Sequence, residues 1–372
     1  MAKPICEIFY NKKSVSPHVR QIYTGFCELA ARNVIDIKFQ EHDWNQNYKT
    51  GNLVKVCVNG LVNVIYDTND GLYWIHGNAE ENIEYFKEVI LPQCNFLFKR
   101  SYRTELSGMA KPYNCDVRPL GFNYDVSSAF NIMDKVCYSR RDKLKRFIGS
   151  SKALSNLLKK EHKHVFFYQN YESLPDMTRD YTDSRILFLT RLWDPDDPIL
   201  ELETSSMKMQ VKEERMRINE TRIECIERCK KQFKDRFIGG LSDDAFTRKT
   251  APKLIASQDL TRKSKFLDLI KLSPICIGTT GLHDSIGWKF AEYVAASRAI
   301  ITEKLLYEVP GEFEPGQNYL EFSTANDLKT QIEYLSGNPS IVNSMMLSNY
   351  RYYNNFLRPD NIILNTLRTV LA

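Results

Sequence analysis

Several features that mark common protein classes are missing from this sequence of 372 residues. No stretch approaches the 18 or more consecutive apolar residues that a membrane-spanning helix needs. The first residues, MAKPICEIFYNKK, hold no continuous apolar segment of the kind found in secretion signals, so we expect none here. There is also no P-loop, no GxGxxG turn and no GxSxG elbow. Kinase, dehydrogenase and serine-hydrolase interpretations therefore lose support.

Charge and cysteine content do not single out a special class either. The 51 basic and 46 acidic side chains give a net charge of +5, too small to indicate a nucleic-acid binder. The nine cysteines are scattered, without a CxxC pair, so we expect free thiols in a reducing compartment. With 43% apolar residues the chain has enough for real cores, and its length favours two domains.

The order of short apolar strands and amphipathic helices predicts an α/β fold of two Rossmann-like domains that face a cleft. We expect domains at 1–125 and 184–345, a connector at 126–183, and C-terminal helices at 346–372 that cross back to the first domain. Within the connector, residues 139–163 carry nine Lys or Arg against two acidic residues. Two interpretations stay open for this segment: a solvated connector, or a peripheral contact with an anionic membrane.

One stretch, 273–303, organises the rest of the chain. Its letters predict a buried strand, a turn rich in Gly and Thr, a helix and a second strand, which is a βαβ unit. Asp284 or Ser285 is a suitable N-cap, and the amides at such a helix start favour a phosphate. Glu292 follows Asp284 by eight residues, close to two helical turns. We therefore expect both carboxylates on one side of the helix.

Two acidic residues around a phosphate-binding helix start resemble the nucleotide-sugar site of GT-B glycosyltransferases, those of the group 1 type. The retaining branch carries Glu, seven residues and a second Glu; here the pattern is Asp284-x7-Glu292. The resemblance implies that Asp284 faces the donor sugar and that Glu292 binds the ribose hydroxyls. It implies that backbone groups hold the diphosphate, at Ser285, Ile286, Gly287 and Trp288. The alternative is that Asp284 is only a cap and Glu292 only an exposed helix residue.

The segment Phe188–Leu192 resembles the strand of this family that ends in Gly-Arg-Leu, which makes Arg191 the match of the phosphate-binding arginine. A forked cation at a strand end suits a diphosphate. The family's lysine five residues later is Asp196 here, so Lys289 is a candidate replacement, with Arg217, Arg222 and Arg248 as weaker ones. The loop WDPDDP is interpreted as a rigid turn and not as a metal-binding loop. We accordingly expect no metal ion and no cofactor beyond the nucleotide-sugar co-substrate.

Polar residues at predicted strand ends of the first domain are candidates for the acceptor side. His18 and Asp67 are the candidate catalytic residues, with Asp67 as general base if the reaction inverts configuration. If the configuration is retained, the leaving phosphate can take the acceptor proton. Structural roles, such as building a turn, are the alternative for each. Further candidates are Ser16, Arg20, Asp70, His76, Lys99 and Arg100.

These features predict an enzyme that moves a sugar from a nucleoside-diphosphate sugar to a glycan or lipid-linked acceptor. We expect it in the cytoplasm, in the synthesis of surface polysaccharide or a similar glycan, without a nucleic-acid partner. A nucleotide-sugar epimerase and a non-catalytic glycan-binding protein of the same fold remain as alternatives. The sugar, the base, the linkage and the stereochemical outcome stay open.

Overall fold

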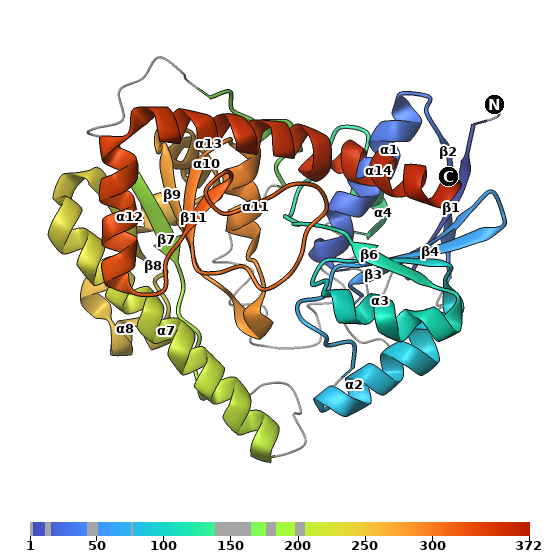
Figure 1. Cartoon of the computed structure of the whole chain (residues 1–372), viewed down its shortest axis with the longest axis horizontal. Helices are drawn as coiled ribbons and strands as arrows, with labels where there is room; N and C mark the ends of the chain where they lie inside the picture. The colour runs from blue at the N-terminus through green and yellow to red at the C-terminus, as the bar shows by residue number, and fades with distance from the viewer. Residues whose placement is uncertain are drawn as a thin grey trace.

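The computed structural model describes residues 3–11, 16–42, 51–75, 77–137, 165–175, 184–197 and 205–372. They form two α/β units that lie beside each other, each built on one sheet (Figure 1). The predicted fold class, two Rossmann-like α/β units, is thereby confirmed. His76 and the basic segment 139–163 lie outside the described residues.

The sheet of the first unit has six strands in the order β2-β1-β3-β4-β5-β6. Five strands run in one direction, and β3 is antiparallel to both of its neighbours. Asn59 and Gly60 adopt positive φ in the tight turn between β3 and β4, which explains this reversal. The strands are β1 (Ile5–Tyr10), β2 (Asp36–Glu41), β3 (Leu53–Val58), β4 (Val62–Asp67), β5 (Phe96–Lys99) and β6 (Asp116–Pro119); the helices are α1 (Arg20–Ala31), α2 (Ala79–Tyr85), α3 (Thr104–Ala110) and α4 (Met133–Cys137).

The sheet of the second unit has five parallel strands in the order β11-β10-β9-β7-β8. Its inner strands are apolar and buried along their length because helices cover both faces. The strands are β7 (Ile186–Thr190), β8 (Phe237–Leu241), β9 (Ile275–Gly278), β10 (Ala299–Thr302) and β11 (Tyr319–Glu321); the helices are α7 (Ser205–Phe233), α8 (Ala245–Thr250), α9 (Gln258–Thr261), α10 (Lys263–Leu272), α11 (Trp288–Ala295), α12 (Ala325–Gly337), α13 (Pro339–Tyr352) and α14 (Pro359–Leu371).

Strand order fixes where a ligand can enter the second unit. Counted from β7, the order is 2-1-3-4-5, so the direction of winding reverses between β7 and β9. In open α/β sheets ligands bind in the crevice at such a switch point, beyond the carboxyl ends of the strands. The loops that follow β7 and β9 are therefore the first places to look for a site.

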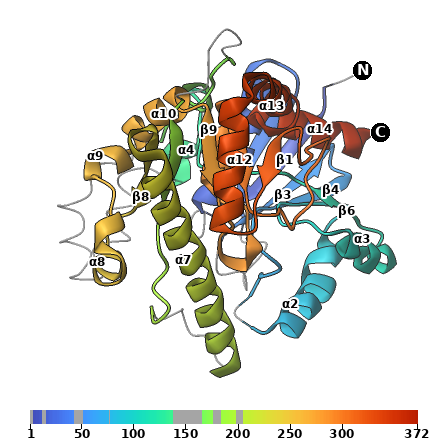
Figure 2. The ribbon, with the colours of Figure 1, turned by 60° about the vertical axis from the view of Figure 1, so that its left-hand side comes forward.

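Helix α14 leaves the second unit and packs on α1 of the first (Figures 1 and 2). A Cβ on Gly25 of α1 would lie 2.2 Å from the Pro359 carbonyl oxygen, so only glycine allows this close approach. The hydroxyls of Tyr66 and Thr366 lie 2.8 Å apart and join α14 to β4.

The two units also meet through packed aromatic rings. The Phe122 ring of the first unit lies 5.0 Å from that of Phe290 and 4.9 Å from that of Phe313, centroid to centroid. Such pairs add to the burial of apolar area and favour one relative placement of the units. Among the described residues, no helix is both long enough and apolar enough to cross a membrane.

Candidate active site

Helix α11 begins at Trp288, beside the switch-point crevice. Its N-cap is Gly287, and no side chain caps it, so the predicted cap at Asp284 or Ser285 is wrong. The preceding loop closes on itself instead: the Gly281 amide donates to the Ser285 carbonyl at 2.8 Å. First-turn amides of an α-helix have no intrahelical acceptor, and the helix dipole is positive there. The start of α11 is thus suited to an anion, as the sequence predicts.

Lys289, in the first turn of α11, is partly buried, and its side chain reaches back toward the end of β7. Its Nζ donates to the carbonyl of Leu189, near the end of β7. Burial lowers the pKa of Lys289 from 10.5 to about 8; nearby Glu292 opposes this shift, and three other cations reinforce it. These cations are Arg222, Lys263 and Arg191. Four positive side chains gathered in one crevice favour the binding of a polyanion.

Arg222 of α7 crosses the crevice from one loop to the other. Its Nη1 donates to the Arg191 carbonyl at 2.7 Å, and its Nη2 donates to the Thr280 carbonyl at 3.0 Å. Its Nε donates to the Thr279 hydroxyl at 3.1 Å. Burial lowers the pKa of Arg222 to about 10, partly offset by Glu303. Because its donors face protein oxygens, Arg222 fixes the two loops relative to each other.

Arg191 follows β7 directly, and its side chain is exposed. The guanidinium lies 3.6 Å from the ring centroid of Trp193, a contact that holds it in place. Partial desolvation by neighbouring protein atoms lowers the pKa of Arg191, and the charge of Asp244 opposes this shift. Asp196, where the resembled family has a lysine, lies at the surface and pairs with Lys212 at 2.7 Å. Arg191 is therefore a positioned cation at the mouth of the crevice.

Glu292 and Asp284 occupy different surroundings, which corrects the prediction that both lie on one helix face. Glu292 is in α11 and only 2% exposed; one carboxylate oxygen pairs with Lys263, and the other is buried with no hydrogen-bond partner in the described parts of the chain. Asp284 precedes the helix, in a turn where it and His283 both adopt positive φ. Asp284 faces α7 instead, 3.3 Å from Arg217.

His18 reaches this region from the first unit. Its ring centroid lies 4.7 Å from that of Trp288, and Asn123 links the two by accepting from Trp288 Nε1 and donating to the His18 carbonyl. Burial lowers the pKa of His18 to about 4, and the Arg100 charge lowers it further. The imidazole is therefore neutral at physiological pH. Its Nδ1 is buried without a hydrogen-bond partner among the described residues.

Arg100 joins the two units at the same loop. Its Nη1 pairs with Asp70 at 2.6 Å, and its Nη2 donates to the Ile286 carbonyl, just before α11. This side chain from the first unit thus holds the loop before α11 in the second unit. Asp70 and Arg100, two of the predicted acceptor-side residues, act here as a clamp between the units.

Asp67 is placed where it cannot serve as the predicted general base. It is fully buried, and one oxygen accepts from the Asn69 amide at 2.9 Å. The other accepts from Trp74 Nε1 and lies 3.3 Å from Lys99 Nζ. With its lone pairs used in this way, Asp67 shapes the loop after β4. Arg20, a further candidate, is also buried and pairs with Asp125 and Asp134.

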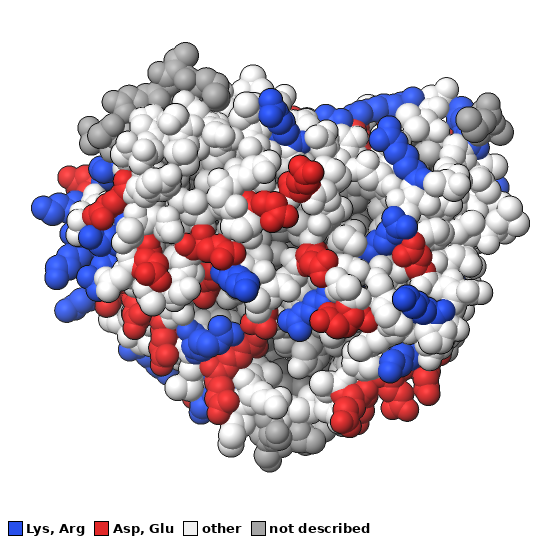
Figure 3. Space-filling view, in the orientation of Figure 1, with Lys and Arg blue, Asp and Glu red and all other residues white. Residues whose placement is uncertain are grey.

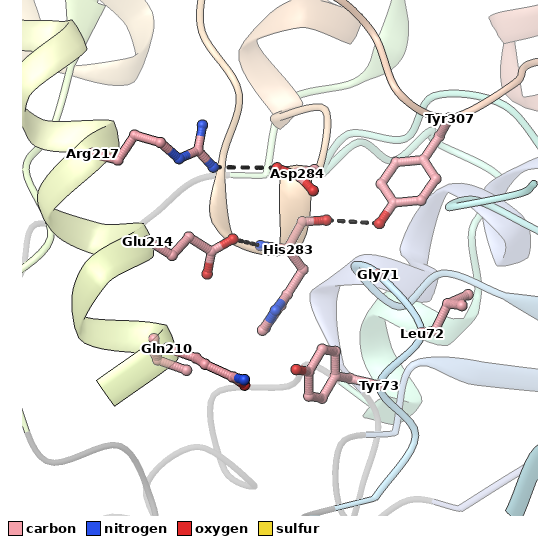
Figure 4. A pocket seen from close by; sticks show the side chains of 10 residues that line it. Gly71, Leu72, Tyr73, Gln210, Glu214, Arg217, His283, Asp284 and Tyr307 are labelled. Carbon is pink, nitrogen blue, oxygen red and sulfur yellow. Dashed lines mark hydrogen bonds and ion pairs between the residues drawn. The ribbon is translucent and has the colours of Figure 1, made fainter. Parts of the chain in front are cut away.

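A pocket of about 360 Å³ opens between the units next to Asp284 (Figure 4). Loop 71–73 of the first unit lines one side, and α7 with the loop at His283 lines the other. Sequence reasoning missed most of its residues. The spacing of Gln210, Glu214 and Arg217 at i, i+4 and i+7 is a signal that one face of α7 points inward.

No group of three or more His, Cys, Asp or Glu among the described residues is arranged to hold a metal ion. Acidic and basic side chains alternate over the face in Figure 3, so that face carries no large field of one sign.

No protein family model and no curated protein match the sequence. Solved structures are similar to it at low identity. HepE of Anabaena, solved with UDP and glucose, is 9% identical with a TM-score of 0.44, and the match covers 99% of each chain. An α1,3-fucosyltransferase is 11% identical with a TM-score of 0.40, covering 100% of this chain and 92% of that one. A UDP-N-acetylglucosamine 2-epimerase is 14% identical with a TM-score of 0.38, covering 100% and 97%. Likenesses this distant carry no conclusion about activity.

Proposed function

We propose that this chain is a glycosyltransferase that moves a sugar from a nucleoside-diphosphate sugar to a glycan or lipid-linked acceptor. The observation that carries the proposal is the group of four cations beside the start of α11, at the switch point of the second sheet. Lys263 pairs with Glu292 and Arg222 donates to protein oxygens, whereas neither Lys289 nor Arg191 forms an ion pair within the described residues. A diphosphate is an anion that fits both a helix N-terminus and a forked guanidinium.

Catalysis in this proposal consists of positioning and charge stabilisation. Negative charge grows on the departing diphosphate as the bond to the sugar breaks. The amides of the first turn of α11, with Lys289 and Arg191, are aimed at that charge before the reaction begins. Fixed dipoles and cations of this kind lower the barrier because they need no reorganisation in the transition state. The reaction accordingly needs no metal ion.

On the acceptor side, His18 and not Asp67 takes the proton of the acceptor hydroxyl. A neutral imidazole beside Trp288 can accept a proton from an acceptor hydroxyl if the reaction inverts configuration. If configuration is retained, the departing phosphate takes the proton and His18 positions the acceptor. We place the reaction in the cytoplasm, where nucleotide sugars are made.

Thermal unfolding with a panel of nucleoside diphosphates and nucleotide sugars tests the proposal. One base should stabilise the protein, by about 2.7 kcal/mol at a ligand concentration 100 times Kd. Product analysis with and without an acceptor then separates transfer from epimerisation, which needs no acceptor. If no member of the panel stabilises the protein, the glycosyltransferase proposal falls and a non-catalytic glycan-binding protein takes its place.

A further inference from the structure

The pocket between the units has features of its own that the diphosphate site does not use. It is lined by both units, and its volume of about 360 Å³ is at the small end of the usual range for ligand pockets. Gly71 adopts positive φ, and a Cβ there would lie 2.7 Å from Cβ of His283. This glycine brings the loop of the first unit against the loop of the second. The pocket thus depends on both units.

Aromatic and planar polar groups face the interior of this pocket. The rings of Tyr73 and His283 lie 4.2 Å apart at 30°, and Figure 4 shows both rings beside Gln210. Tyr307 donates its hydroxyl to the His283 carbonyl at 2.8 Å, and Glu214 accepts from the His283 amide, so the loop is held from two sides. Phenol, imidazole and amide groups can each bind a hydroxyl, while the rings offer apolar faces to the C–H surface of a sugar.

The charged side chains that line the pocket are Glu214, Asp284 and Arg217, so their net charge is negative. Asp284 and Arg217 form an ion pair and cancel. Glu214 has no ion pair of its own within the described parts of the chain, so its carboxylate is left uncompensated. Burial and the charge of Glu214 raise the pKa of Tyr73, which keeps its hydroxyl protonated as a donor. An anionic group entering this pocket would lose hydration and meet a like charge.

We propose that this pocket receives an uncharged, hydroxyl-rich sugar ring of the acceptor and rejects acceptors that carry a phosphate or carboxylate there. The inference rests on the proposed function and names its acceptor class. The attractive part is the ring and amide surface of Tyr73, His283 and Gln210, and the repulsive part is Glu214. Discrimination needs both parts, since tight contacts to one ligand do not by themselves exclude another.

Saturation-transfer NMR with three families of probes tests this assignment: methyl glycosides of common hexoses and N-acetylhexosamines, their 6-phosphates, and uronic acids. At least one neutral glycoside should give a signal about fivefold or more above its charged counterparts. Tyr73→Ala and Gln210→Ala should each reduce that signal severalfold. Glu214→Gln should raise the signal of the charged probes. Glu213→Gln is the matched control, because Glu213 is exposed on the same helix and does not line the pocket.

Three results would overturn the assignment. The first is charged probes that bind as well as neutral ones and lose their signal in Tyr73→Ala. The second is the absence of any glycoside signal, with UDP present or absent. The third is a glycoside signal that vanishes when a stabilising nucleotide sugar is added, because the pocket would then hold the donor's sugar. Calorimetry with nucleoside diphosphates is done in parallel. Diphosphate binding without glycoside binding refutes only the assignment of the pocket. Glycoside binding without diphosphate binding refutes only the proposed function.

Discussion

Replacing Lys289 by methionine separates two effects of this cation: its cost to folding stability and its contribution to diphosphate binding. The side chain is partly buried, and desolvation lowers its pKa from 10.5 to about 8. A charged Lys289 is therefore about 3 kcal/mol less stable in the fold than in the unfolded chain. Methionine has a similar shape and removes that cost. It also removes the hydrogen bond to the Leu189 carbonyl, worth roughly 1 kcal/mol. We expect Lys289→Met to stabilise the free protein at pH 7 by about 2 kcal/mol.

The pH dependence of unfolding provides a second test of the predicted stabilisation by Lys289→Met. A lysine whose pKa is depressed by folding destabilises the protein fully below about pH 8, and the cost fades as the pH rises toward 10.5. The advantage of the methionine variant should therefore shrink by about 2 kcal/mol between pH 7 and pH 9.5. Denaturant unfolding at several pH values measures it. Lys265→Met on the exposed side of α10 is the control and should show no such trend.

Binding should change in the opposite direction. Loss of a charge-assisted bond to the diphosphate costs roughly 1.5–3 kcal/mol, which is a Kd about 10- to 150-fold weaker. In the wild type, diphosphate affinity should decline above about pH 8, where free Lys289 loses its proton. Calorimetry on the nucleoside diphosphate found by the thermal screen measures both effects. A methionine variant that is less stable at pH 7 and binds the diphosphate normally would refute the reasoning.

Four further predictions concern the same site. Arg191→Ala should weaken nucleoside-diphosphate binding by roughly 10- to 150-fold and lower turnover; unchanged affinity in a folded variant removes Arg191 from the site. Glu292→Gln should weaken binding of both diphosphate and donor, whereas Asp284→Asn should spare diphosphate binding and lower turnover; equal small effects in calorimetry and rate assays would mean that the donor lies elsewhere. His18→Gln should lower kcat, and the wild-type rate should fall as the pH drops through about 4, where His18 gains its proton; a pH–rate profile unaltered by the substitution contradicts a proton-transfer role. Transfer should persist in excess chelator, and activity restored by Mn²⁺ or Mg²⁺ after EDTA treatment would contradict this.

The sequence predicts the fold well because the spacing of apolar residues along the chain indicates which strands and helix faces are buried. The apolar run at Ile275–Gly278 marks a buried strand, and the apolar spacing after Trp288 marks a helix, both as found. The reversal of β3 was not predicted, although the Asn59-Gly60 pair signals a hairpin.

The site is predicted less well, because its contacts join residues far apart in the chain. Lys263 and Glu292 form an ion pair although they are 29 residues apart in the sequence, and no local pattern predicts such a pair. Asp67 has the sequence context of a polar loop residue, in YDTNDG. In the structure it is buried against Lys99 and Trp74, which come from other parts of the chain. The predicted N-cap, Asp284 or Ser285, lies two or three residues before the observed one, Gly287, because Asp284 is a residue type that often caps helices but adopts positive φ here.

The packing of α14 on α1 has a consequence for how the protein is made. The core that surrounds α1 includes Ile363 and Leu367, so the first unit lacks part of its interior until α14 has been synthesised. Synthesis at roughly 5–20 residues per second leaves a delay of about ten to fifty seconds between β6 and α14. During that time the α1 surface at Gly25 stays uncovered on the ribosome. We therefore expect the first unit to complete its folding only after α14 has been synthesised, and to be a substrate for chaperones until then.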